Sequence, residues 1–153
     1  MAVYTKLNKK NIEEIISNYS IGKLEDFKGI EDGIENTNYF LLVENKKYIL
    51  TIYEKRVKEK DLPFFSELMT GLNKENFMCP VPIKNNKNQT ITNYKNKNLM
   101  IVSFLEGKAK HVLNPDNCKS LGHEVARMHL ITKKFEIQRQ NDLSVKSWRK
   151  IFE

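Results

Sequence analysis

Apolar residues near the start of the chain recur at the spacing of a helix. They are Ile12, Ile15, Ile16 and Tyr19. Asn8 precedes them as a suitable N-cap, and Gly22 is expected to end the helix. A strand candidate follows at 23–30, and a polar loop is predicted from there to Thr37.

The next segments carry the β-branched and aromatic residues that favour strands. Residues 38–44 and 47–53 flank Asn45-Lys46, which predicts an antiparallel hairpin. A second hairpin is predicted from 90–94 and 98–104, with its turn around Asn96.

A helix is predicted between the two hairpins, at residues 61–75. Asp61 is a plausible cap, and Pro63 suits the first helical turn. One face of this helix is an apolar stripe made of Phe64, Phe65, Leu68, Met69 and Leu72. Because such a stripe needs an apolar surface to cover, we expect the helix to pack across the sheet.

The last predicted helix opens at Asn114-Pro115 and runs to about Lys133. Its inward residues are expected to be Leu121, Val125, Met128 and either Ile131 or Thr132. The element order is therefore helix, three strands, helix, two strands, helix. This order predicts an α+β fold with an antiparallel sheet of about five strands.

Composition limits the classes of function. The 153 residues are 40% apolar and 29% charged, which is typical of a globular domain. The net charge is +7, but the basic residues are 22 Lys and 4 Arg, spread along the whole chain. Phosphate and base recognition relies heavily on Arg, so nucleic-acid binding is not expected. A basic nucleic-acid-binding module remains the alternative from another functional class.

The sequence also constrains where in the cell the protein is expected. No apolar run approaches the roughly 18 residues of a membrane helix, and the first residues contain no apolar secretory core. Cys79 and Cys118 are far apart and form no CxxC motif, which favours reduced thiols. We expect a cytoplasmic protein that does not contact a membrane.

The order of elements suggests a chemistry. A loop, a hairpin, a helix, a second hairpin and a glycine-marked exit at Gly107 occur in this order in the N-terminal lobe of kinases. That lobe covers the triphosphate with its loop and holds adenine at the connection to the next lobe. Gly29 and Gly33 bound the polar loop here, although glycines near a strand also mark ordinary turns.

Six stretches resemble one kinase family. They are GIENTNYF (33–40), YILTIYEKR (48–56), EKDLPFF (59–65), CPVPI (79–83), IVSFLEGK (101–108) and LGHEVARMH (121–129). Together they resemble homoserine kinases of the aminoglycoside phosphotransferase and choline kinase type, over nearly the whole chain. The resemblance implies ATP and Mg²⁺ as cofactors and the side-chain hydroxyl of homoserine as acceptor, on the route to threonine. A choline, sugar or aminoglycoside kinase of the same fold is the near alternative.

The resemblance also implies a domain plan and a set of cofactor-binding residues. Residues 1–107 would form the N-terminal lobe, and 108–153 the start of a helical C-terminal lobe. The loop at 29–38 would cover the phosphates, and the hinge would hold adenine. The implied contacts are Gly33, Asn36, Thr37 and Asn38 in the loop, Glu67 in the helix, and Ser103, Phe104 and Leu105 in the hinge. For the loop polar residues the competing interpretation is turn chemistry, and for Glu67 it is a solvated helix position.

One implied feature departs from the wider family of related kinases. The strand lysine that pairs with the helix glutamate is replaced by Thr51, and Lys47, Lys55 or Arg56 could supply the cation instead. His129 is expected to be a packing residue.

The family's catalytic loop and its metal-binding Asp are expected beyond Glu153. HVLNPDN at 111–117 does not replace them, because Leu113 stands where the Asp would be. The final apolar residues Trp148, Ile151 and Phe152 also look as if they need a partner. No catalytic or metal-binding residue is therefore expected within the chain, which is expected to be a truncated, inactive portion.

Overall fold

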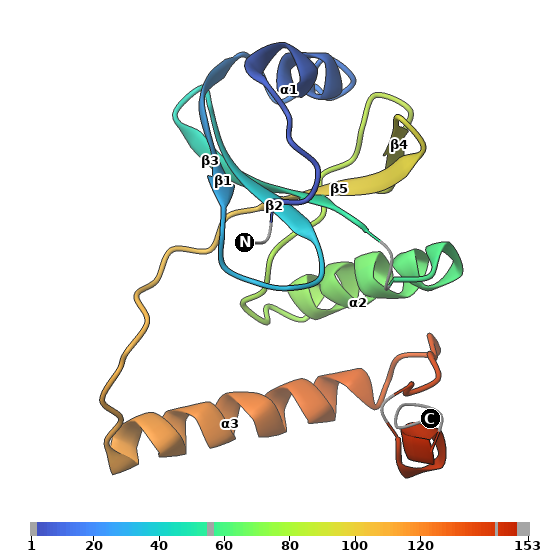
Figure 1. Cartoon of the computed structure of the whole chain (residues 1–153). Coiled ribbons are helices and arrows are strands. Elements are labelled where there is room, and N and C mark those ends of the chain that lie inside the picture. The colour runs from blue at the N-terminus through green and yellow to red at the C-terminus, as the bar shows by residue number, and fades with distance from the viewer. Residues whose placement is uncertain (1–2, 55–56, 143, 150–153) are drawn as a thin grey trace.

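The computed structural model describes residues 3–54, 57–142 and 144–149. Its longer elements, in chain order, are α1 (Lys9–Ile16), β1 (Leu24–Ile30), β2 (Thr37–Val43), β3 (Lys46–Ile52), α2 (Leu62–Lys74), β4 (Thr92–Tyr94), β5 (Lys97–Ser103) and α3 (Pro115–Thr132). The strands form one antiparallel sheet in the order β1-β2-β3-β5-β4 (Figure 1). The predicted α+β fold with five antiparallel strands is confirmed.

Both hairpins close through two-residue turns with positive φ. The β2–β3 turn is Glu44-Asn45, with φ of 45° and 62°, and it pairs Val43 with Lys46. Two such residues make the turn whose twist matches that of the flanking strands. This turn lies one residue before the predicted Asn45-Lys46, because asparagine takes the second left-handed position. The β4–β5 turn, Lys95-Asn96, repeats the arrangement with φ of 48° and 63°.

The first helix begins where the sequence predicts. Asn8 and Asn11 form a reciprocal cap, in which each side-chain oxygen accepts the backbone N–H of the other residue, at 3.0 and 3.2 Å. The helix ends at Ile16, with Ser17 as C-cap, and not at Gly22. Gly22 instead makes the turn into β1 with a φ of 108°, where a Cβ would lie 2.3 Å from the Glu44 carboxyl carbon.

The main hydrophobic core lies between α1 and one face of the sheet, which we call the closed face. Alternate strand residues point to this side and are buried, as the two-residue repeat of a strand requires. They are Tyr39, Leu41, Val43, Tyr48, Leu50, Ile52, Leu99 and Ile101. The helix contributes Ile12, Ile15, Ile16 and, just beyond it, Tyr19.

The second helix, α2, runs along the other side of the sheet from α1 (Figure 1). Its fully covered residues are Leu62, Ser66 and Leu72, so most of the predicted apolar stripe is only half-buried. The segment after α3 packs against α2 at Gly71, beside that stripe. A Cβ at Gly71 would lie 2.8 Å from the Phe135 ring.

The predicted capping role of Asp61 is wrong. Its backbone is already helical, with φ −92° and ψ −14°, and its side chain makes no capping hydrogen bond. Its carboxylate instead accepts a hydrogen bond from Arg139 Nε at 3.1 Å, and the same guanidinium lies 5.5 Å from the Phe65 ring centroid. Asp61 therefore ties α2 to the segment that follows α3.

The last helix starts at its predicted cap, because Asn114 and Asn117 repeat the reciprocal arrangement. Its predicted inward face is buried only at the C-terminal end, where Ile131 is covered and Met128 is half-buried. Leu121 and Val125 are 65% and 40% exposed, and His129 is also exposed, which corrects its expected packing role. The reason is that α3 meets α2 near the end of each helix and otherwise runs clear of the sheet (Figure 1).

Two expectations from composition can be compared with the structure. Both cysteines are free thiols, and burial raises the pKa of Cys79, whose Sγ donates to the Met69 carbonyl at 3.3 Å. Within the described residues, no helix combines the length and the apolar character needed to cross a membrane.

Candidate functional site

The face of the sheet opposite α1 is only partly covered, and we call it the open face. It carries the strand residues that alternate with the core, and their register places them in two rows. One row is Phe40, Ile49 and Val102, and the next is Asn38, Thr51 and Met100. All except the buried Met100 are half-buried. The open face therefore presents a flat apolar patch with a polar pair beside it.

That polar pair includes Thr51, the residue at which the sequence resemblance implies a lysine in related kinases. The Thr51 hydroxyl donates to Asn38 Oδ1 at 2.8 Å. Lys47 lies toward the other end of β3, where its ammonium pairs with Glu106 at 2.5 Å and sits 5.7 Å from the Phe104 ring centroid. Lys47 is thus engaged at the hinge, whereas Lys55 and Arg56 lie outside the described residues.

The loop between β1 and β2 is shorter than predicted. It comprises residues 31–36, because β1 continues to Ile30 and β2 begins at Thr37. Gly33 has a φ of 108°, which side-chain-bearing residues rarely adopt, and no atom lies within 4 Å of the position a Cβ would take. Gly29 does not bound the loop. It is a strand residue, and a Cβ at this position would lie 3.1 Å from a methyl carbon of Val3.

The end of the loop is anchored by hydrogen bonds. Asn36 Oδ1 accepts the Glu54 backbone N–H at 3.4 Å. Thr37 is fully buried, and its hydroxyl donates to Glu54 Oε1 at 2.7 Å. Thr37 Oγ1 also accepts the backbone N–H groups of Tyr4 and Thr5, at 3.0 and 3.1 Å. The Thr37 hydroxyl is therefore already occupied and screened from solvent.

Sequence reasoning missed Glu54, the centre of this anchor. Its side chain is 10% exposed and accepts hydrogen bonds from Lys97 Nζ at 2.5 Å and from Thr5 Oγ1 at 2.6 Å. Burial alone would raise the pKa of this carboxyl, but the hydrogen bonds from Lys97 and the two threonines, with the Lys97 charge, outweigh it and lower the pKa. An acidic residue two positions after the end of an apolar strand was the available signal.

The hinge residues differ in whether their backbone N–H groups already make hydrogen bonds. The Ser103 N–H donates to the Val81 carbonyl at 2.9 Å, and the Phe104 N–H donates to the Lys47 carbonyl at 3.2 Å. The Phe104 ring meets Phe40 edge-on at a centroid distance of 5.6 Å, which joins the hinge to the open face. In the described part of the chain, the Leu105 N–H makes no hydrogen bond. Leu105 thus offers a free backbone donor beside the apolar patch.

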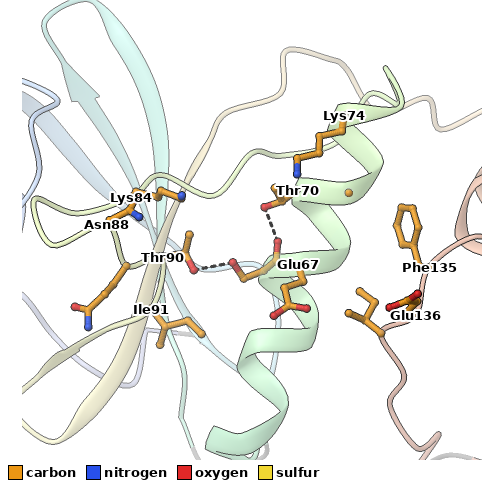
Figure 2. Close-up of a pocket in the computed structure, with 13 residues that line it drawn as sticks. Glu67, Thr70, Lys74, Lys84, Asn88, Thr90, Ile91, Phe135 and Glu136 are labelled. Carbon is orange, nitrogen blue, oxygen red and sulfur yellow. Dashed lines mark hydrogen bonds between the residues drawn. The ribbon is translucent and has the colours of Figure 1, made fainter.

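Glu67 lies apart from the other predicted site residues. It is exposed on α2 and lines a cavity of about 700 Å³ between α2, residues 84–91 and residues 135–137. Figure 2 shows it between Thr90 on one side and Phe135 on the other. The loop and hinge residues do not line this cavity. The structure therefore puts Asn38 on the open face and joins the hinge to it through Phe104, whereas the loop lies at the far end of β2 and Glu67 lies outside this group.

Comparison with known sequences gives a consistent family. Residues 26–151 match the phosphotransferase enzyme family. A homoserine kinase from Methylobacterium radiotolerans is 42% identical over 152 residues, which is 99% of this chain and 47% of that protein. One from Bradyrhizobium diazoefficiens is 40% identical over 153 residues, with 100% and 47% covered. The chain therefore spans about half the length of the curated relatives it matches.

Solved structures share the fold at low sequence identity. A spectinomycin phosphotransferase, crystallised with ADP and spectinomycin, has a TM-score of 0.64 at 15% identity and covers 96% of this chain and 46% of its own. A microcompartment-associated aminopropanol kinase has a TM-score of 0.70 at 11% identity, with 93% and 48% covered. With the family matched over most of its length, this chain belongs to the phosphotransferase enzyme family.

Proposed function

We propose that this chain is the nucleotide-binding part of an ATP-dependent homoserine kinase. Residues 1–107 are the N-terminal lobe, and 108–153 are the start of the helical lobe. The observation that carries the proposal is that Phe104 of the hinge packs on Phe40 of the open face, while the loop leads into β2 at the other end of that face. Relatives named homoserine kinase, about 40% identical over the whole chain, support the substrate.

The open face suits the adenine ring. Phe40, Ile49 and Val102 form a half-buried apolar row against which a flat heteroaromatic ring can lie. The free Leu105 N–H then donates to a ring nitrogen at the edge of the purine. Ser103 and Phe104 hold the hinge through their own backbone bonds, and Phe104 closes the apolar row against Phe40.

The loop suits the phosphates. Gly33 allows the backbone of residues 31–36 to approach anionic oxygens closely, because no Cβ intervenes. The Asn36 amide nitrogen, which has no partner among the described contacts, is a further donor. Asn38 lies in the next row with Thr51. Thr37 contributes by fixing the end of the loop through Glu54.

The described residues do not fit a Mg²⁺ site. They contain no group of three or more His, Cys, Asp or Glu side chains that could hold a metal ion. We therefore assign the metal to no residue of this chain. Because the resemblance places the catalytic loop elsewhere in such kinases, we expect residues 1–153 alone to transfer no phosphate to homoserine.

A chimera tests the proposed function directly. Residues 1–153 would replace the matched 47% of the Methylobacterium radiotolerans homoserine kinase. We expect the chimera to form ADP in a homoserine-dependent reaction, since a lobe from the same type of kinase should present ATP to the remaining half. The matched control joins the chain to the uncovered part of the aminopropanol kinase and should be inactive. A folded but inactive homoserine kinase chimera would contradict the proposal.

Replacing Gly33 by valine in the active chimera should weaken ATP use. A β-branched residue cannot take a φ of 108° without strain, so the loop must move away from the phosphates. We expect a loss of about 1–3 kcal/mol in kcat/KM for ATP, typical of several weakened charge-assisted hydrogen bonds. The affinity for homoserine should change little.

The matched control for this substitution is Gly122→Val. Gly122 is an exposed residue of α3, has open space around its Cβ position and has no positive φ. Its replacement should leave the ATP kinetics unchanged. If Gly33→Val lowers only the melting temperature and the folded fraction keeps its ATP parameters, Gly33 is merely a turn glycine.

A further inference from the structure

The first residues of the described chain form a strap across the loop end of the sheet. We define the strap as residues 3–7. Two side chains fix the backbone of the strap. Thr37 Oγ1 accepts two N–H groups of the strap, and the Tyr39 hydroxyl bridges two further backbone groups. That hydroxyl accepts the Leu7 N–H at 2.8 Å and donates to the Thr5 carbonyl at 2.9 Å. Both threonine and tyrosine are buried residues of β2.

The strap also reaches the loop itself. The Tyr4 hydroxyl donates to the carbonyl oxygen of Ile34 at 2.9 Å, one residue after Gly33. The Ile34 side chain is 75% exposed, so it supplies no buried anchor for the loop. A hydrogen bond to this carbonyl therefore restricts the backbone at the point where glycine makes it most free.

A partly buried charge pair, Glu54 with Lys97, holds the strap and the loop end together. Glu54 accepts hydrogen bonds from the hydroxyls of Thr5 in the strap and Thr37 in β2. Lys97 of β5 donates to Glu54 and also to Thr5 Oγ1 at 2.7 Å. The Glu54 backbone N–H in turn binds the Asn36 side chain of the loop. Strap, loop and two strands thus meet at one residue, Glu54, whose carboxylate binds the strap and both strands and whose backbone N–H binds the loop.

We infer that Tyr4 and Thr5 are positioning residues that order the phosphate-binding loop before the nucleotide arrives. This inference rests on the proposed function. An ordered loop loses less conformational entropy when its N–H groups close on phosphate oxygens. Adenosine carries no phosphates, so its binding gains nothing from an ordered loop. The strap therefore sets how much tighter ATP binds than adenosine.

The test compares two hydroxyl deletions in the chain 1–153. Tyr4→Phe removes the bond to Ile34. Tyr94→Phe is the matched control, because its hydroxyl donates to Glu14 at a distance of 2.8 Å, away from the loop. The measurements are amide hydrogen exchange of residues 31–36, affinity for ATP and for adenosine by titration calorimetry, and a melting curve.

We expect Tyr4→Phe to speed exchange in the loop and weaken ATP binding by about three- to tenfold each, the range for one lost hydrogen bond. Adenosine affinity and the melting temperature should match those of Tyr94→Phe. Loop exchange equal to that of the control would overturn the strap's role. If wild-type chain binds ATP no better than adenosine, the proposed function fails, while the exchange data still decide whether the strap orders the loop.

Discussion

Replacing Glu54 by alanine is expected to lower the free energy of unfolding by about 2–4 kcal/mol. The change removes the acceptor for the Thr5 and Thr37 hydroxyls and leaves Lys97 without its partner. The loss should be smaller than for a fully buried ion pair, because Lys97 is 40% exposed and water can partly solvate it.

Denaturant unfolding measures this effect, with Glu67→Ala as the matched control. Glu67 is exposed, and no ion pair of it is seen among the described residues, so its loss should cost less than about 0.5 kcal/mol. Equal effects of the two substitutions would mean that the Glu54 cluster adds nothing to stability.

The pH dependence provides an internal check on the same variant. The folded-state pKa of Glu54 is lowered, so its contribution is complete above the ordinary glutamate pKa of about 4.3. It is lost as the pH falls through the lower folded-state pKa and the carboxyl is protonated. The stability gap between wild type and Glu54→Ala should therefore be widest near neutral pH and narrow in acid.

The second large expected effect is a difference in stability between substitutions on the two faces of β3. Leu50→Ala should lower the free energy of unfolding by about 2–5 kcal/mol, because Leu50 is fully buried on the closed face between Tyr39 and Ile101. Ile49 is the preceding residue of the same strand but lies half-buried on the open face. Ile49→Ala should cost less than half as much stability.

Adenosine affinity should respond in the opposite way: Ile49→Ala should lower it more than Leu50→Ala does. Ile49→Ala removes part of the proposed adenine surface and should weaken adenosine binding several-fold, since dispersion and apolar burial are lost. Leu50→Ala should leave the affinity of the folded fraction near the wild-type value. Titrations below the unfolding midpoint of both variants make this comparison. Equal affinities for both variants would remove Ile49 from the site.

Periodic features of the fold were predictable because they depend on neighbours in sequence. The sheet, both hairpins and the caps at Asn8 and Asn114 follow from strand alternation, turn residues and capping chemistry. The wrong predictions concern residues whose contacts depend on a segment distant in the sequence. Asp61 meets Arg139, 78 residues away, and the apolar stripe of α3 remains uncovered over most of its length.

The candidate site shows the same division. The end of the last strand and the loop glycine could be located from sequence, since both are local features. The Glu54 cluster could not, because its members come from four separate segments and Lys97 lies 43 residues from Glu54 and 92 from Thr5. Sequence also could not reveal that the Thr37 hydroxyl is already committed, or that Glu67 faces a different cavity.

The asparagines of the turns have a consequence for the unfolded chain. Among the described residues, six non-glycine residues have positive φ, and four of them are asparagine, namely Asn45, Asn76, Asn88 and Asn96. Asparagine tolerates the left-handed conformation, yet its side chain allows fewer backbone states than glycine when the chain is unfolded. Folding therefore loses less conformational entropy at these four points than it would in a chain that turned on glycine.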